Sequence, residues 1–290
     1  MSAEAASLQA VGRPFAARRR RAEALRARHP FADEVLTVYL ALLPAQEEAW
    51  AAVRERPPGP DELPRWVAAH VLPAVVDATV AAGPRALREA VEVRPAGANH
   101  EALVGWLQGA ELDPVDRYLA RASLAPVLEA LGDGAGAACA PVGDAEASSR
   151  CPRCGGLPQL SFIASSGESL VSGPRSLLCA RCGLHWGWSR SVCPACGESE
   201  DTKLSVYAER LEGPVVSGNG NGDRDRDDGR PVFPHLRIAA CATCSRYLIE
   251  VDLARDARAV PEVDELTALP LDLYAADEGL TKITPNLMGF

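Results

Sequence analysis

The chain has 290 residues, enough for two domains or for one domain with an appended module. Apolar residues make up 47% and charged residues 24%, as in a globular protein with a buried core. The net charge of −9 is spread evenly, with 16 basic and 20 acidic residues in 1–150 and 14 and 19 in 151–290. Neither half carries the basic excess that nucleic-acid binding requires, so we expect no nucleic-acid partner.

The sequence also argues against membrane insertion and export. The best apolar stretch, Val71–Gly83, is too short to span a bilayer and is interrupted by Asp77. No apolar stretch follows the basic cluster Arg18–Arg21, as a secretory signal would require. We therefore expect a cytoplasmic protein with reduced thiols, in which CxxC pairs favour metal over disulfides.

Helical periodicity dominates the first 131 residues. Residues 1–28 are rich in Ala and Arg and are expected to be a frayed helix or a flexible lead. Apolar residues from Phe31 onward recur at three- and four-residue steps, which predicts an amphipathic helix over Phe31–Arg56 that Pro44 bends or ends. A second helix is predicted over Leu63–Ala82, and Pro73 is expected to disrupt it internally.

The clearest helix signal starts at Asp113. Its carboxylate can cap free backbone N–H groups, and Pro114 occupies a first-turn position where no donor is needed. Gly132 follows the last apolar residue of the pattern and marks the end of the helix. Because no convincing period-two strand precedes residue 130, we expect 1–131 to be an all-helical domain.

The second half changes character. Residues 132–149 are small, polar and rich in Gly, as in a flexible linker. Periodicity then shortens to two around Gln159–Ile163 and Lys203–Tyr207, which predicts strands. The fold class is therefore α+β, with a helical domain before two tandem rubredoxin- or zinc-ribbon-like metal modules and a C-terminal helical tail. The expected ranges are a first module at 150–190, a second module at 191–260 with a disordered insertion at 212–231, and a C-terminal helical segment at 261–290 that Pro270 interrupts.

Four CxxC pairs carry the chemistry of the sequence. Two residues between cysteines let a tight turn aim both sulfurs at one metal ion, and Gly follows three of the pairs, where a left-handed residue closes the turn. Eight sulfurs make two tetrahedral S4 sites, which suit iron or zinc. The predicted ligands are Cys151, Cys154, Cys179, Cys182, Cys193, Cys196, Cys241 and Cys244.

Two pairings of these motifs are open. Sequential pairing joins the first motif to the second and the third to the fourth, so that each site closes one ribbon. Nested pairing would leave only ten residues between Cys182 and Cys193 inside its inner site, which is short but feasible for a ribbon. We favour sequential pairing.

The cysteines and their neighbours also have alternative interpretations. Redox-active CxxC pairs lie at the start of a helix in a βαβ unit, and these motifs lack that context. Zinc with a purely structural role explains the motifs as well as a metal with a functional role does. Cys139 is expected to be an incidental thiol, and His185 a surface histidine, since each site already has four sulfurs. Trp186 and Trp188 share a face at period two and are expected to pack a small core.

The cysteine-rich half resembles the formate dehydrogenase accessory protein (FdhE) family. The similarity covers about 151–290, and before that only the helical character. It rests on the four CxxC pairs in their local context and on the closing segment. These motifs are CPRCGGLP (Cys151–Pro158), LLCARCGLHW (Leu177–Trp186), SRSVCPACGE (Ser189–Glu198), CATCSRYL (Cys241–Leu248) and DELTALPLDLYAADEGL (Asp264–Leu280).

The resemblance implies an accessory protein, not an enzyme. Members bind the catalytic subunit of molybdenum- or tungsten-dependent formate dehydrogenases and are required for their activity. By position, the resemblance implies that the eight cysteines are metal ligands. It also marks Trp186, Arg190 and Tyr247 as residues typical of the family, without assigning them a role. The alternative function, from a different functional class, is a rubredoxin-type iron electron carrier. A nucleic-acid-binding zinc ribbon is disfavoured, because acidic residues outnumber basic residues in this half of the chain. The sequence leaves homo-oligomer formation open.

Overall fold

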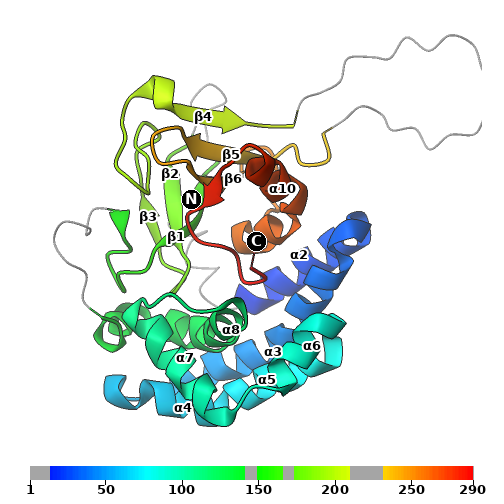
Figure 1. The fold of residues 1–290 in the computed structure, drawn as a ribbon, viewed down its shortest axis with the longest axis vertical. Helices are drawn as coiled ribbons and strands as arrows, with labels where there is room; N and C mark the ends of the chain where they lie inside the picture. The colour runs from blue at the N-terminus through cyan, green and yellow to red at the C-terminus, as the bar shows by residue number, and fades with distance from the viewer. Residues whose placement is uncertain (1–13, 141–148, 166–172, 210–230, 290) are drawn as a thin grey trace, which may run out of the picture.

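The computed structural model describes residues 14–140, 149–165, 173–209 and 231–289. Within these ranges, helices occupy the first half of the chain and strands much of the second, which confirms the predicted fold class. The helices form one layer and the sheet another, and the C-terminal end of the chain lies between them (Figure 1).

The helical layer follows the predicted periodicity. Its buried side chains recur on one face of each amphipathic helix, and they pack around α8 at the centre of the layer. The helices are α2 (Pro14–Arg28), α3 (Asp33–Glu55), α4 (Leu63–His70), α5 (Leu72–Ala82), α6 (Arg85–Glu92), α7 (Ala96–Gln108) and α8 (Pro114–Leu131).

Helix α8 begins and ends where the sequence indicates. The Asp113 carboxylate accepts the backbone N–H groups of Val115 and Asp116 at 3.0 and 3.1 Å, and Pro114 lies in the first turn. Gly132 follows the last helical residue with φ of 56°. Side chains on nearly every side of α8 are buried, because α3, α5 and α7 all pack against it.

Two expectations for the helical half need correction. Helix α3 runs through Pro44 instead of ending there, because Leu42 and Leu43 are fully buried and their packing outweighs the hydrogen bond that the proline removes. Residues 14–28 form the ordered helix α2 rather than a frayed lead, because Phe15 and Arg21 are buried against the rest of the chain; residues 1–13 lie outside the described part.

The two cysteine modules share one sheet. Its strand order is β3-β2-β1-β6-β5-β4, and the short strand β7 also pairs with β6. The bounds are β1 (Pro158–Ile163), β2 (Arg175–Cys179), β3 (His185–Gly187), β4 (Leu204–Tyr207), β5 (Leu236–Cys241), β6 (Arg246–Asp252) and β7 (Thr281–Lys282).

Each module repeats the same plan. A CxxC pair precedes the first strand of an antiparallel three-stranded meander, and a second CxxC pair forms the turn between its last two strands. The modules join where β1 runs parallel to β6, with Leu160 beside Ile249. Strand β7 pairs with the start of β6 at Arg246 and Tyr247, so the C-terminal tail also enters the sheet.

The expected linker and tail are more ordered than their composition indicates. Residues 132–138 form a 3-10 helix that packs on α8 with Ala135 fully buried, whereas 141–148 lie outside the described residues. The C-terminal segment contains α9 (Pro261–Asp264) and α10 (Leu269–Asp277). Pro270 lies in the first turn of α10, where its missing N–H costs nothing. The predicted disordered insertion at 212–231 lies outside the described residues except for Pro231.

Candidate metal centres

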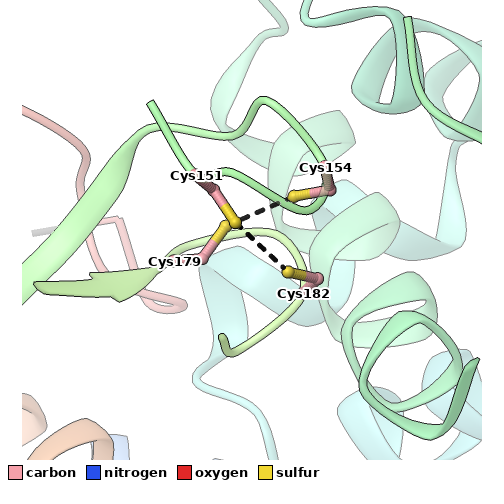
Figure 2. Close-up of side chains that lie close together, drawn as sticks. All are labelled: Cys151, Cys154, Cys179 and Cys182. Carbon is pink, nitrogen blue, oxygen red and sulfur yellow. Dashed lines mark hydrogen bonds between the residues drawn. The ribbon is translucent and has the colours of Figure 1, made fainter. Parts of the chain in front are cut away.

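The first four-cysteine group lies in the core between the two layers. The sulfurs of Cys151 and Cys182 are 3.6 Å apart, and those of Cys154 and Cys179 are 3.4 Å apart. All four side chains are at most 3% exposed and belong to the same apolar cluster as the buried faces of α3, α5 and α8. They come from two loops and point toward one another (Figure 2).

The second group lies nearer the surface. Its sulfurs are 3.8 Å apart between Cys193 and Cys244 and also between Cys196 and Cys241. Cys193 and Cys241 are buried, whereas Cys244 is half-buried and Cys196 is exposed. The structure thus groups the motifs in the favoured sequential pairing and not in the nested one.

The turns explain why these spacings bring sulfurs together. Gly155, Gly183 and Gly197 each have φ between 67° and 78°, and each donates its N–H to the carbonyl oxygen of the first cysteine of its motif. This left-handed conformation favours glycine and closes the turn around the two thiols. In the fourth motif the equivalent residue is Ser245, whose φ is 53°. The backbone there keeps the left-handed conformation, although the residue that follows the motif is not a glycine.

The distances fit a single ion in each group. Four sulfurs about 2.3 Å from the centre of a tetrahedron are separated by roughly 3.8 Å. The observed sulfur–sulfur distances of 3.4–3.8 Å match that separation and are far longer than the roughly 2.05 Å of a disulfide. All sulfurs within each group lie within 4.8 Å of one another, so each group could hold one metal ion.

Backbone donors point to one sulfur of each group. The N–H groups of Arg181 and Ala195 point to the sulfurs of Cys179 and Cys193 at 3.3 and 3.4 Å. Such donors favour the thiolate form that a metal requires. The guanidinium of Arg181 also donates to the Cys154 carbonyl oxygen at 2.9 Å, which fixes it beside the first group. No spacing in the sequence points to this arginine.

The structure places a fifth sulfur beside the first group. Cys139 is half-buried in the same apolar cluster, with its thiol beside Cys154 and the Arg181 guanidinium. Its sulfur is not one of the four that come together. His185 is exposed, as expected, and its ring packs against Phe162 with 4.9 Å between ring centroids.

The remaining singled-out residues have structural contacts. Trp186 and Trp188 both pack on a small apolar cluster around Leu177, in agreement with the expected packing role. Arg190 donates to the Gly173 carbonyl oxygen at 2.5 Å, and the Tyr247 hydroxyl donates to the Asp272 carboxylate at 2.8 Å in the interior. Among the described residues, no hydrogen bond joins any of these side chains to a cysteine sulfur.

Comparison with known proteins finds relatives of this chain by sequence. No family model matches the chain. It is 29% identical over 140 residues to a protein FdhE homolog of Aquifex aeolicus, and 30% identical over 146 residues to one of Pseudomonas aeruginosa. These alignments cover 48% and 50% of this chain but only 41% of either relative, so the chain matches less than half the length of these curated relatives.

The fold comparison covers more of the chain. The crystal structure of the FdhE protein from Pseudomonas aeruginosa superposes on 94% of this chain and 94% of its own, with a TM-score of 0.60 and 23% sequence identity. In the described part of the chain, no helix combines the length and apolar character needed to cross a bilayer. The comparisons confirm the resemblance to the FdhE family that the cysteine motifs indicate.

Proposed function

We propose that this chain is an accessory protein that binds the catalytic subunit of a molybdenum- or tungsten-dependent formate dehydrogenase in the cytoplasm and is required for that enzyme's activity. The observation that carries the proposal is the pair of four-cysteine groups on a fold shared with an FdhE protein over 94% of both chains. The chain itself is proposed to have no catalytic residues.

In this proposal, each four-cysteine group holds one iron or zinc ion. The ligands would be Cys151, Cys154, Cys179 and Cys182 at the first site and Cys193, Cys196, Cys241 and Cys244 at the second. The sulfur spacing fits a tetrahedral ion at both sites. Bound there, either metal supplies a cross-link between two turns, and iron also supplies one-electron exchange.

An electron-carrier role is the second candidate, and the exposure of the second site favours it. Cys196 is exposed and Cys244 half-buried, so a partner could approach these sulfurs closely. The first site is enclosed by the helical core, where a structural role fits better. Metal analysis of protein purified without air separates the two functions, because zinc alone at both sites would exclude electron transfer.

An exposed apolar groove supports a protein-binding role. Six large apolar side chains are exposed among the described residues, and four of them line one groove of about 760 Å³. They are Phe31, Val206, Val232 and Tyr274. Contiguous exposed apolar patches are typical of protein-interaction sites and binding grooves. Phe31 was expected on the buried face of its helix, but it precedes α3 and is 46% exposed.

The groove lies beside one edge of the described sheet. Among the described residues, strand β4 pairs with β5 on one side only and forms the outer edge of the sheet (Figure 1). A free strand edge offers backbone donors and acceptors to an extended segment, while neighbouring pockets take its apolar side chains. We expect an extended apolar segment of the client subunit to bind there.

The proposal is tested by co-purification and by gene deletion. A tagged catalytic subunit of formate dehydrogenase should retain this chain through purification, and a deletion strain should lose formate dehydrogenase activity that the intact gene restores. Full activity in the deletion strain would overturn the proposal.

A further inference from the structure

A second cleft, of about 550 Å³, lies between the helical layer, the first cysteine loops and the C-terminal tail. Its walls come from the end of α7, from the turns that hold Cys154 and Cys179, and from β7 with the residues that follow it. Neither the predicted metal ligands nor the apolar groove described above contributes to its lining. Its volume is that of a small-molecule site.

The lining of this cleft is strongly cationic. It includes the side chains of Arg117, Arg181 and Arg246, none of which forms an ion pair with a carboxylate of the described residues. Lys282 also lines the cleft, but the carboxylates of Glu265 and Asp272 neutralise it. Arg150 also lines the cleft but is left out of this balance, because its guanidinium already donates to the Gly155 carbonyl oxygen at 3.3 Å. Glu111 is the one acidic residue in the described lining. Cations therefore outnumber carboxylates among the described residues that line the cleft.

Three residues that line the cleft each carry a buried polar atom without a hydrogen-bond partner among the described residues. The atoms are Nε1 of Trp106, Nε of Arg181 and Oγ1 of Thr284. Arg181 and Thr284 are each only 7% exposed, so water reaches them poorly. A buried unsatisfied donor is destabilising and calls for a specific explanation. A ligand in the cleft would place acceptor oxygens beside the residues that carry these atoms.

The local backbone holds Arg181 at this position. One guanidinium nitrogen donates to the Cys154 carbonyl oxygen at 2.9 Å, and the guanidinium lies 6.0 Å from the centre of the Trp106 ring. Gly109 has φ of 77°, and a Cβ there would come within 3.3 Å of Arg181 Nη2. The left-handed glycine at the end of α7 thus leaves room for the arginine.

The cleft and the first sulfur group share a thin wall. Gly156 lines the cleft, and a Cβ at this position would come within 2.8 Å of the Cys179 sulfur and 3.3 Å of the Cys154 sulfur. Gly156 therefore lies between the cleft and these two sulfurs, and no larger side chain would fit there. A molecule in the cleft would lie next to the sulfurs without replacing any of them.

We propose that this cleft binds a small polyanion that carries phosphoryl groups. Guanidinium groups bind phosphoryl oxygens through paired, charge-assisted hydrogen bonds, and several unpaired cations around one space favour a ligand with more than one negative charge. A monocarboxylate would satisfy fewer of the donors and would leave most of the charge unbalanced. This site is independent of the client-binding role proposed above.

Calorimetric titration of the full-length, metal-containing protein with inorganic pyrophosphate tests the proposal, with acetate as the monoanion comparison. Pyrophosphate should bind and acetate should bind at least tenfold more weakly. Arg117→Gln and Arg246→Gln should each weaken pyrophosphate binding by about tenfold or more at constant ionic strength. Both variants should keep the metal content of the parent, because no hydrogen bond among the described residues joins either side chain to a cysteine sulfur.

Arg65→Gln is the matched control, because Arg65 is an exposed arginine on α4 that does not line the cleft. It should bind pyrophosphate as the parent does. An equal loss of affinity in all three variants would show nonspecific attraction and would overturn the proposal. So would undetectable pyrophosphate binding at millimolar concentration, whether or not the chain binds its client.

Discussion

The guanidinium of Arg121 on α8 donates to the side-chain oxygen of Gln159 on β1 and joins the helical layer to the sheet. The same guanidinium donates to the Pro285 carbonyl oxygen at 2.6 Å, and the Gln159 amide donates to the Glu265 carboxylate at 2.9 Å. Burial lowers the pKa of Arg121 to about 10, although the Glu265 carboxylate partly offsets this effect. One buried contact thus links three parts of the chain.

Replacing this arginine should loosen the junction between the layers. Arg121→Met removes the donor to two buried oxygens, so we expect the free energy of unfolding to fall by about 1–3 kcal/mol. Denaturant unfolding measures the change. Arg88→Met, on the exposed side of α6, is the control and should change it by less than about 0.5 kcal/mol. Equal stability of Arg121→Met and the parent would contradict the junction role.

The helix cap at Asp113 predicts a pH-dependent contribution to stability. The Asp116 backbone N–H and the Arg94 guanidinium lower the pKa of the Asp113 carboxyl to about 2 in the folded chain, below its ordinary value of 3.8. Because the folded pKa is the lower one, the stabilisation is complete above about pH 4 and is lost as the pH falls toward 2.

Asp113→Asn keeps a capping oxygen but cannot ionise, so it isolates the charge. The parent should be more stable than this variant at pH 6, and thermal unfolding should show the difference shrinking between pH 4 and pH 3. Asp113→Ala should lose about 1 kcal/mol at pH 6 through loss of the cap. A parent–Asn difference that stays constant with pH would contradict the assignment.

The two sulfur groups should respond differently to loss of a ligand. Cys154→Ser and Cys196→Ser should each lower metal content from two ions to one per chain, because three sulfurs hold a tetrahedral ion poorly. Cys154→Ser should lower the melting temperature more, since its site lies within the core of α3 and α8 whereas Cys196 is exposed.

Cys139→Ser is the control for these variants. It removes the sulfur nearest the first group and should leave two ions per chain. Loss of an ion in this variant would mean that Cys139 is a ligand and that the proposed set is wrong.

The apolar groove predicts a separable defect in client binding. Val206→Asp places a charge on the exposed face of the edge strand β4, where Val206 is 60% exposed, so folding should be unaffected. It should reduce co-purification of the formate dehydrogenase catalytic subunit several-fold. Val93→Asp is the matched control, because Val93 is 79% exposed away from the groove. Equal retention of the client by both variants would place the interface elsewhere.

Local sequence signals were sufficient for the sulfur groups and for the cap of α8. A CxxC turn and an N-terminal Asp-Pro are determined by residues within a few positions of one another, so one sequence reveals them. The pairing of the motifs followed from a topological preference for closing each ribbon separately, and the structure confirms it.

Contacts between residues far apart in the chain leave no local signal in a single sequence. The parallel pairing of β1 with β6 depends on Leu160 and Ile249, which are far apart in the chain, and nothing in either strand specifies the other. The order of α2 depends on the buried ion pair of Arg21 with Asp264, at the opposite end of the chain. The composition of residues 1–28 indicates a frayed helix or a flexible segment. It does not reveal the helix α2, because the carboxylate that pairs with its buried arginine is distant in sequence.

The same limit applies to the cationic cleft. Arg117, Arg181 and Arg246 occupy three different elements, and each arginine alone reads as an ordinary surface charge. Only the packing of the C-terminal tail against the first cysteine loops brings them around one space. Sequence periodicity carries no signal for such a site.

Native mass spectrometry of the chain purified without air, combined with elemental analysis, tests the central claim most directly. We expect two iron or zinc ions per folded chain, with eight cysteines protected from alkylation until the ions are removed. A folded chain without bound metal, or one whose paired motifs are joined as disulfides, would contradict the assignment of both four-cysteine groups as metal centres.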